Sequence, residues 1–368
     1  MEILLEGLMA MTWKQAVMML VGFFLIYIAI KKEYEPMLLL PIGFGAILTN
    51  IPMSSAVGEG GFLTILYNAG IKTELFPILI FIAVGAMIDF SPLLKQPVML
   101  FFGAAAQFGI FAAMLLAAST GKFSLQEAAA IGIIGAADGP TSIYVANKFA
   151  KDYIGPISVA AYSYMALVPF IQPPVIRLLT TEKERKIRME ANYDAKVSKK
   201  VLIAFPILVT IIAGIIAPVS VGLVGALMFG NLVRECGVLE RLSQSAQNEL
   251  ANLVTLLLGI TIGSTMTAET FLAPTTLLIL GIGLLAFIFD TAGGVLFAKL
   301  VNLFLKDKVN PMIGAAGISA FPMSARIIQK MAQEEDPNNF ILMQAVGANV
   351  AGQIGSIIAG GILLALLS

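Results

Sequence analysis

Membrane-length apolar segments recur along the whole chain, and they are compatible with only one fold class. In a bilayer every backbone N–H and C=O must form its hydrogen bond within the protein, and a helix forms all of these bonds within one segment. Of the 368 residues, 58% are hydrophobic and 12% are charged, so the sequence predicts an all-α polytopic membrane protein with about ten to twelve apolar segments. The segments lie near 13–30, 37–51, 75–88, 97–118, 128–145, 157–179, 201–217, 219–232, 250–266, 274–305, 311–323 and 340–367.

One charged loop divides these segments. The stretch 177–200 carries eight Lys or Arg against four Asp or Glu, and a basic excess in a short loop indicates the cytoplasmic side. We interpret residues 1–180 as a first membrane half, 181–200 as a charged cytoplasmic hinge loop, and 201–368 as a second membrane half. The loop is expected to be a solvated face, with docking of soluble subunits as the alternative.

The composition narrows the available chemistry. The chain has no histidine and a single cysteine, Cys236, which excludes an intramolecular disulfide and a cysteine-clustered metal site. Without histidine the commonest proton shuttle and transition-metal ligand is absent. Carboxylates, amides, hydroxyls, Lys and Arg must therefore carry any reaction or ion binding.

Asp138 interrupts the apolar stretch 128–145 inside the sequence Gly135-Ala-Ala-Asp-Gly-Pro-Thr141. An ionised group at bilayer depth costs at least about 2.5 kcal/mol, so it usually faces a cavity and handles an ion or a proton. Pro140 disfavours helix at the preceding residue, and unwound backbone is tolerated only where it lines a cavity or is buried in protein. The sequence therefore predicts a broken helix that holds Na⁺ or a proton near the midplane.

An internal repeat links the two halves. The sequence Ile-Gly-Ala-Ala at Ile134 returns 179 positions later at Ile313, and Gly85 is related to Gly263 by an offset of 178. Chance remains the alternative for such short matches in an apolar chain. If each half crosses the membrane an odd number of times, the repeats are inverted, and broken segments near Asp138 and Ser319 face each other.

The second half offers neutral oxygens at the equivalent place. Residues 310–326 carry amide, hydroxyl and guanidinium groups without a carboxylate, and 347–356 adds Asn349 among glycines. One carboxylate with neutral oxygen ligands suits a monovalent cation, and Na⁺ is the natural candidate. The glycines are expected to serve helix packing, and Asn349 is equally compatible with ion binding and with a bond between helices.

Three further acidic residues interrupt apolar sequence. Asp89 is expected to cap the segment that follows it, and Glu269 occupies a similar turn before Pro274. Asp290 lies inside the stretch 284–297 and has no assigned role, with pairing to Lys299 as one possibility.

These motifs together resemble a known family, the beta subunits of the Na⁺-translocating biotin-dependent decarboxylases that act on oxaloacetate, glutaconyl-CoA, methylmalonyl-CoA or malonate. The resemblance extends over nearly the whole chain. Its most specific parts are 135–144 (GAADGPTSIY), 162–169 (YSYMALVP), 230–237 (GNLVRECG), 310–326 and 347–356 (GANVAGQIGS). The chain is short for the oxaloacetate branch, which favours the acyl-CoA branches.

The resemblance implies roles for individual residues, each of which has the residue type that the family pattern requires. The implied functional positions are Asp138, Tyr164, Asn310, Gly314, Ser319, Arg326 and Asn349. The implied Na⁺ ligands are Asp138, Asn310, Gly314, Ser319 and Asn349. The implied catalytic residues are Asp138, Tyr164, Ser319 and Arg326, with Arg326 also holding carboxybiotin.

The implied activity is that of a membrane-bound enzyme, a translocase in the bacterial cytoplasmic (inner) membrane that decarboxylates carboxybiotin, exports Na⁺ and consumes a proton. Tyr164 or Ser319 could relay the proton, and Arg326 could bind the carboxylate. Each has a simpler alternative. Arg326 could snorkel from a helix end, Tyr164 could anchor at the interface, and Ser319 could bond its own helix.

The resemblance also implies an assembly. The expected partners are a soluble carboxyltransferase (alpha) subunit, a biotin carrier and a small single-span membrane subunit, in a homo-oligomer without nucleic acid. No biotin-accepting lysine motif is visible, which indicates that carboxybiotin comes from a separate carrier chain. The alternative function is a Na⁺- or proton-coupled secondary transporter or antiporter, which would use the same halves and the same Asp138.

Overall fold

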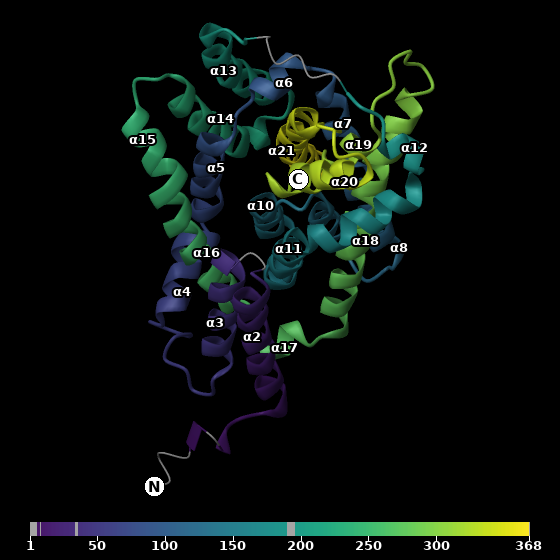
Figure 1. Cartoon of the computed structure of the whole chain (residues 1–368). Helices are drawn as coiled ribbons and strands as arrows, with labels where there is room; N and C mark the ends of the chain where they lie inside the picture. Colours follow the sequence, from purple (N-terminus) through teal and green to yellow (C-terminus); the bar gives the residue numbers. More distant parts are fainter. Residues whose placement is uncertain (1–5, 8, 34–35, 190–195, 368) are drawn as a thin grey trace.

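The computed structural model describes all residues except 1–5, 8, 34–35, 190–195 and 368. The described chain consists of helices and turns, with no strand (Figure 1). The first half contains α2 (Trp13–Lys32), α3 (Pro36–Asn50), α4 (Phe62–Leu66), η1 (Tyr67–Ile71), α5 (Leu75–Met87), α6 (Ser91–Lys95), α7 (Met99–Ala105), α8 (Phe108–Ser119), α9 (Leu125–Gly132), η2 (Ile133–Ala136), α10 (Gly139–Phe149), η3 (Lys151–Tyr153) and α11 (Ile154–Leu179). The rest contains α12 (Glu182–Arg185), α13 (Lys199–Ile216), η4 (Pro218–Ser220), α14 (Val221–Glu235), α15 (Glu240–Ser245), η5 (Ala246–Leu250), α16 (Ala251–Ser264), α17 (Ala268–Phe271), α18 (Pro274–Val301), α19 (Met312–Ala315), α20 (Met323–Glu335) and α21 (Leu342–Leu367).

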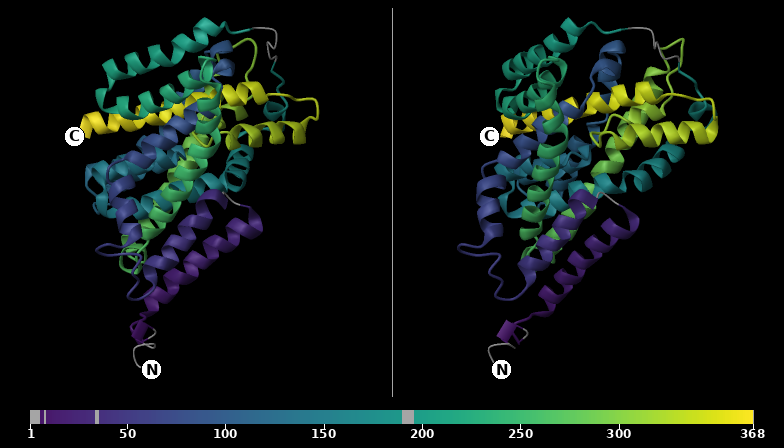
Figure 2. Two further views of the ribbon diagram at one scale, coloured as in Figure 1. Left: turned by 90° about the vertical axis from the view of Figure 1, so that its left-hand side faces the viewer. Right: turned by 60° about the vertical axis from the view of Figure 1, so that its left-hand side comes forward.

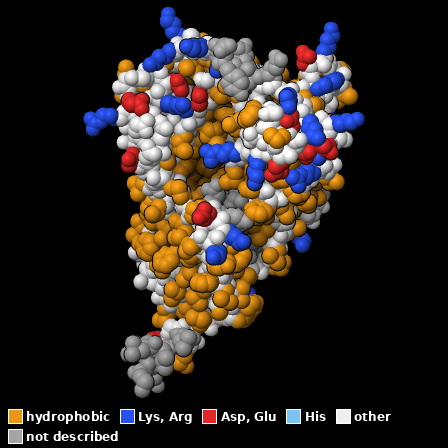
Figure 3. All heavy atoms as spheres, in the orientation of Figure 1, with side chains coloured by type: hydrophobic (Ala, Val, Ile, Leu, Met, Phe, Trp, Pro, Cys, Tyr) orange, Lys and Arg blue, Asp and Glu red, His pale blue; other side chains and the backbone are white. Residues whose placement is uncertain are grey.

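The chain is an all-α polytopic membrane protein. Five of the described helices are long and apolar enough to span a bilayer, and up to seven spans result if two sharply bent helix pairs are each counted as one. The predicted apolar segments also include shorter apolar helices, Pro36–Asn50 and Leu125–Ala136, which are not among these five. Figure 3 shows the charged side chains gathered towards one end and an apolar surface over the rest, which is the distribution expected for a protein surrounded by lipid.

The helices form two bundles, each with members from both halves (Figures 1 and 2). In the side bundle α2 packs on α3, α3 on α16, α5 on α14 and α13 on α14. In the core bundle α8 and α11 pack on α18, α7 packs on α21, and α18 packs on α19. The two halves therefore interlock, and neither bundle can form from one half alone.

The contacts occur in matched pairs. Pairing the helices of the two halves in chain order makes α3 equivalent to α14, α5 to α16, α7 to α18 and α11 to α21. The contact of α3 with α16 then corresponds to that of α14 with α5, and the contact of α11 with α18 to that of α21 with α7. The two π-helical turns, Tyr67–Ile71 and Ala246–Leu250, are also 179 positions apart. These matches support the internal repeat, and the domain boundaries at 180 and 200 stay a proposal.

Two glycines that the repeat relates make equivalent close contacts. A Cβ on Gly85 would lie 1.8 Å from the carbonyl oxygen of Leu227 on α14, and a Cβ on Gly263 would lie 2.3 Å from that of Ile42 on α3. Any larger side chain at these positions would push the helices apart. Their small size therefore sets the distance between helices in the side bundle.

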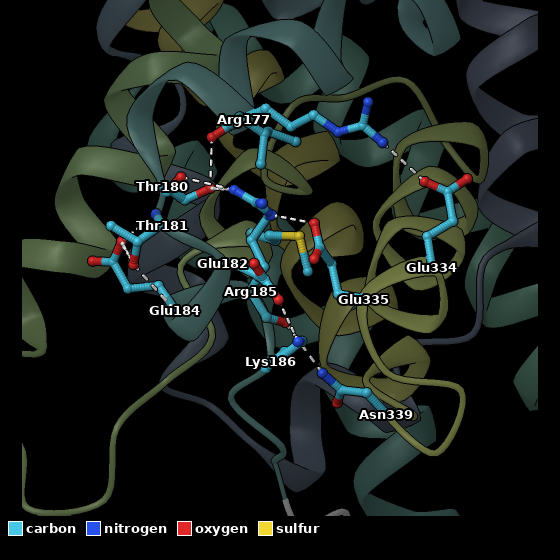
Figure 4. A network of polar contacts seen from close by, with 12 residues as sticks. Arg177, Thr180, Thr181, Glu182, Glu184, Arg185, Lys186, Glu334, Glu335 and Asn339 are labelled. Carbon is cyan, nitrogen blue, oxygen red and sulfur yellow. Dashed lines mark hydrogen bonds and ion pairs between the residues drawn. The ribbon is translucent and has the colours of Figure 1, made fainter.

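The linker between the halves is bound to the second half (Figure 4). Arg185 Nε donates to Glu335 at 2.5 Å, and Arg188 pairs with Asp336 at 2.7 Å. The side chain of Asn310 donates to the carbonyl oxygens of Arg185 and Ile187, at 2.8 and 3.0 Å. We call these contacts of residues 181–188 with Asn310, Glu335 and Asp336 the linker clamp. The described part of the linker is therefore attached to the second half, while Glu182, Lys183 and Arg188 stay exposed, as a solvated face requires.

Candidate functional site

Asp138 lies at a break between two helices, as predicted. The turn η2 ends at Ala137, which has φ +52°, a left-handed conformation that stops the preceding helix. Asp138 is the N-cap of α10, and Pro140 fits the first turn of that helix, where its missing N–H costs nothing. The local sequence therefore forces the chain to unwind where the carboxylate stands.

Three hydrogen bonds hold the Asp138 carboxylate. Its Oδ1 accepts the backbone N–H of Thr141 at 3.2 Å. Its Oδ2 accepts the hydroxyls of Thr141 and of Ser356, both at 2.7 Å. The side chain is buried, and no ion pair in the described chain involves it. Capping explains the Thr141 bonds, but it does not explain a buried anion without a cation.

Ser319 lies at the matching break in the second half, between α19 and α20. Its N–H donates to the carbonyl oxygen of Ala136 at 2.9 Å, which joins the two breaks directly. Its hydroxyl donates to the carbonyl oxygen of Gly352 at 2.8 Å, so the oxygen lone pairs stay available. Gln353 donates its side-chain N–H to the Ser319 carbonyl oxygen.

α21 supplies the remaining polar groups. Asn349 Nδ2 donates to the carbonyl oxygen of Ile318 at 2.6 Å, and its Oδ1 is buried without a hydrogen-bond partner. Asn349, Gln353 and Ser356 lie four and then three positions apart, so they share one face of the helix. We call Asp138, Ser319, Asn349, Gln353 and Ser356 the Asp138 group.

A cavity of about 250 Å³ adjoins this group. Asp138, Ser319 and Gln353 line it on one side, and Gln247 and Asn252 of the side bundle line it on the other. The cavity therefore lies between the bundles, where a small ion and part of a larger substrate could meet the carboxylate.

The tyrosine beside Asp138 is Tyr162, which the sequence reasoning missed. Tyr162 lines the cavity and is packed so closely on Gly139 that a Cβ there would lie 2.2 Å from the ring. The predicted Tyr164 instead donates its hydroxyl to the carbonyl oxygen of Leu280 on α18, at 2.5 Å. Residues two apart on a helix point in different directions, so only one tyrosine of the pair can face the cavity.

Asn310 and Gly314 lie outside the hydrogen-bonded Asp138 group. Both amide functions of Asn310 are used, since Nδ2 binds the linker carbonyls and Oδ1 accepts the N–H of Met312 at 3.1 Å. Gly314 packs on α18, where a Cβ would lie 1.9 Å from the carbonyl oxygen of Gly294. The structure places Asn310 in the linker clamp and Gly314 in a helix crossing.

Arg326 is exposed on α20, seven positions after Ser319. The exposed position fits both a substrate anchor and the simpler alternative of a snorkelling cation. Its binding of carboxybiotin stays a prediction.

The other acidic residues are now placed. Asp89 Oδ1 accepts the N–H of Ser91, the first residue of α6, at 2.8 Å, although the N-cap residue of that helix is Phe90. Glu269 is exposed in α17. Lys299 pairs with Glu184 at 3.1 Å and not with Asp290, which is fully buried in α18.

The donor set fits a monovalent cation. A single carboxylate, hydroxyl oxygens and one orphaned amide oxygen meet at the two breaks, and these are hard ligands with one compensating charge. The described residues contain no cluster of three or more His, Cys, Asp or Glu side chains that would suit a multivalent metal.

Comparisons with known proteins show the family to which the chain belongs. The family described as Na⁺-transporting oxaloacetate decarboxylase beta subunit matches residues 14–367. Similar relatives include the glutaconyl-CoA decarboxylase subunit beta of Acidaminococcus fermentans, 52% identical over 98% of this chain and 96% of its own. The methylmalonyl-CoA decarboxylase subunit beta of Propionigenium modestum is 49% identical over the same shares. The oxaloacetate decarboxylase beta chain of Klebsiella pneumoniae is 46% identical over 97% and 96%. The chain belongs to the family of Na⁺-transporting decarboxylase beta subunits, which are multi-pass bacterial membrane proteins.

Proposed function

We propose that this chain is the membrane subunit of a primary Na⁺ pump, which decarboxylates carboxybiotin, exports Na⁺ and consumes a proton. The observation that carries the proposal is the Asp138 group: a buried carboxylate at one helix break, bonded to Ser356 of the other half and adjoining a cavity. A carboxylate of this kind in a membrane protein marks an ion or proton pathway. Family membership supplies the coupling to decarboxylation.

Na⁺ is the cargo of the proposed site. Asp138 supplies the charge, and Ser319, Asn349 and Ser356 supply neutral oxygens, of which Asn349 Oδ1 has no other partner. We leave Asn310 and Gly314 out of the ligand set because their contacts lie in the linker clamp and the helix crossing.

The decarboxylation needs a proton. The bond between the carboxyl carbon and the ureido nitrogen breaks, CO₂ leaves, and a proton joins the nitrogen. The Tyr162 hydroxyl in the cavity wall is the proposed donor to that nitrogen. Tyr164 and Ser319 stay candidates for relaying the proton, and Arg326 for holding the carboxylate before it leaves.

The partners follow from the reaction. Carboxybiotin must reach the cavity from outside the chain, so we propose a separate biotin carrier together with a soluble carboxyltransferase and a small single-span membrane subunit, in a homo-oligomeric complex. Relatives of this chain are named as subunits, which supports a multi-subunit complex.

The alignment lengths favour an acyl-CoA as the substrate of the complex. The chain aligns over 362 positions with the Acidaminococcus glutaconyl-CoA subunit and over 418 with the Klebsiella oxaloacetate chain. Both alignments cover nearly the same share of this chain, 98% and 97%. The longer alignment with the Klebsiella chain therefore contains more gaps. The present chain therefore matches the acyl-CoA relative with fewer insertions.

Reconstitution tests the function. Liposomes that contain the purified complex receive free carboxybiotin, and ²²Na⁺ uptake and CO₂ release are followed together. The pump requires both to occur together, with uptake against a Na⁺ gradient. A secondary transporter would move Na⁺ in a gradient without carboxybiotin, and that result would reject the proposal.

A further inference from the structure

A second carboxyl group is buried in the core bundle, beside the first turn of α8. Asp290 lies in the middle of α18 with no exposed surface. Its Oδ1 accepts the N–H of Ile110, in the first turn of α8, at 3.2 Å. Its Oδ2 is buried and has no hydrogen-bond partner. Capping of α8 uses one oxygen and leaves the other unexplained.

No positive charge faces Asp290 in the described structure. The elements α7, α8, η2 and α19 contain no charged residue. The titratable groups on the other packed elements have other partners or positions: Glu127 caps α9 at Ser124, Tyr162 lines the cavity beside Asp138, Tyr164 binds Leu280, Arg177 pairs with Glu334, Lys299 pairs with Glu184, and Glu269 is exposed. An ionised carboxylate without a partner is strongly disfavoured in such an environment.

The surroundings of Oδ2 fit a proton and not a metal ion. A Cβ on Gly135 would lie 2.6 Å from Oδ2, so Oδ2 faces a glycine at close range. Na⁺ needs several oxygen ligands, and this glycine offers no side-chain oxygen. A proton on Oδ2 needs no further ligand.

The turn η2 connects this carboxyl to the Asp138 group. Its Gly135 touches Asp290, its Ala136 accepts the N–H of Ser319, and Asp138 follows two residues later. We propose that Asp290 is a second, proton-holding carboxyl whose protonation keeps η2 in place, so that the Asp138 group is assembled only when Asp290 is neutral. Ionisation breaks only the O–H bond, and the proton passes to water.

Infrared spectroscopy of the purified chain tests the proton directly. At alkaline pH with saturating Na⁺, surface carboxyls and Asp138 are ionised, so a protonated-carboxyl C=O band reports a buried acid. We expect the band in wild type and in Asp138→Asn, and its loss in Asp290→Asn. Its absence from wild type, or its persistence in Asp290→Asn, would overturn the assignment. If Asp290→Asn does not fold, loss of the band in Asp138→Asn would still overturn the assignment.

The coupling is tested by the Na⁺ concentration that half-maximally raises the melting temperature, measured against pH. This step rests on the proposed Na⁺ site. Above the pH at which Asp290 ionises, the Na⁺ concentration for half-maximal stabilisation of wild type should rise roughly tenfold per pH unit. The reason is that only the protein with neutral Asp290 binds Na⁺. Asp290→Asn should stay flat in that range. The control Asp89→Asn alters a carboxylate that also accepts a helix-start N–H and should follow wild type.

Two results would count against the coupling. An alkaline rise in Asp290→Asn equal to that of wild type would show that another group is responsible. An absence of Na⁺ stabilisation in wild type at every pH would reject the Asp138 site, while the infrared result for Asp290 would stand by itself. Proton competition at Asp138 weakens Na⁺ binding as the pH falls and is therefore separable from a loss of binding as the pH rises.

Discussion

Ser356→Ala is the sharpest test of how the two halves share one site. The Ser356 hydroxyl is 2.7 Å from Asp138 Oδ2 and 3.1 Å from the carbonyl oxygen of Gln353. It has one hydrogen to donate, and the shorter contact to the carboxylate is the stronger. A hydrogen bond to a charged group contributes about 1.5–3 kcal/mol. Alanine is a better helix former by about 0.5 kcal/mol, so the helix itself should not suffer.

Loss of this hydrogen bond should weaken Na⁺ binding, because Ser356 connects the Asp138 carboxylate to the helix that carries Asn349. A free-energy change of about 1.4 kcal/mol alters a binding constant tenfold. Loss of this hydrogen bond should therefore weaken the apparent Na⁺ affinity by about 10- to 100-fold. The midpoint of Na⁺ activation of decarboxylation measures this. Ser158→Ala is the matched control, since Ser158 is also buried in a helix but its hydroxyl has no partner. A Ser356→Ala midpoint within twofold of the control would refute the reasoning.

Three other changes test separate contacts. Tyr162→Phe removes the hydroxyl from the cavity wall and should slow carboxybiotin decarboxylation by about 10²-fold or more, while an unchanged rate would remove Tyr162 as donor. Arg185→Ala leaves a partly buried carboxylate of the linker clamp unpaired and should lower the free energy of unfolding by about 1.5–3 kcal/mol, seen as a lower melting temperature. The hydrogen bond from Arg188 lowers the pKa of Asp336, so its stabilisation is complete above the ordinary aspartate pKa and is lost as the pH falls through the lowered value. The melting difference between wild type and Asp336→Asn should thus be steady above about pH 5 and shrink below about pH 4, and a difference that grows in acid would contradict this.

The sequence predicted those features of the site that neighbouring residues in the chain determine. Asp138 is flanked by the glycine and proline that break the helix, and Ser319 stands between two prolines in a stretch of small residues, so both breaks were visible. Ser356 was not singled out, although its spacing of seven from Asn349 places both on one helical face. That spacing was the available signal.

Other features depend on tertiary packing and could not be read locally. The rotation of α11 decides whether Tyr162 or Tyr164 faces the cavity, and the contact with α18 sets that rotation. Asn310 was assigned to the ion through the family resemblance, and only the folded chain shows that its amide donates to the linker carbonyls.

The most direct test of the central claim is Na⁺ binding to the purified chain, measured by calorimetry for wild type and Asp138→Asn with K⁺ as the competing ion. The account predicts Na⁺-selective binding in wild type, loss of that binding in Asp138→Asn, and normal binding in the Asp89→Asn control. Equal Na⁺ affinity in wild type and Asp138→Asn would contradict it.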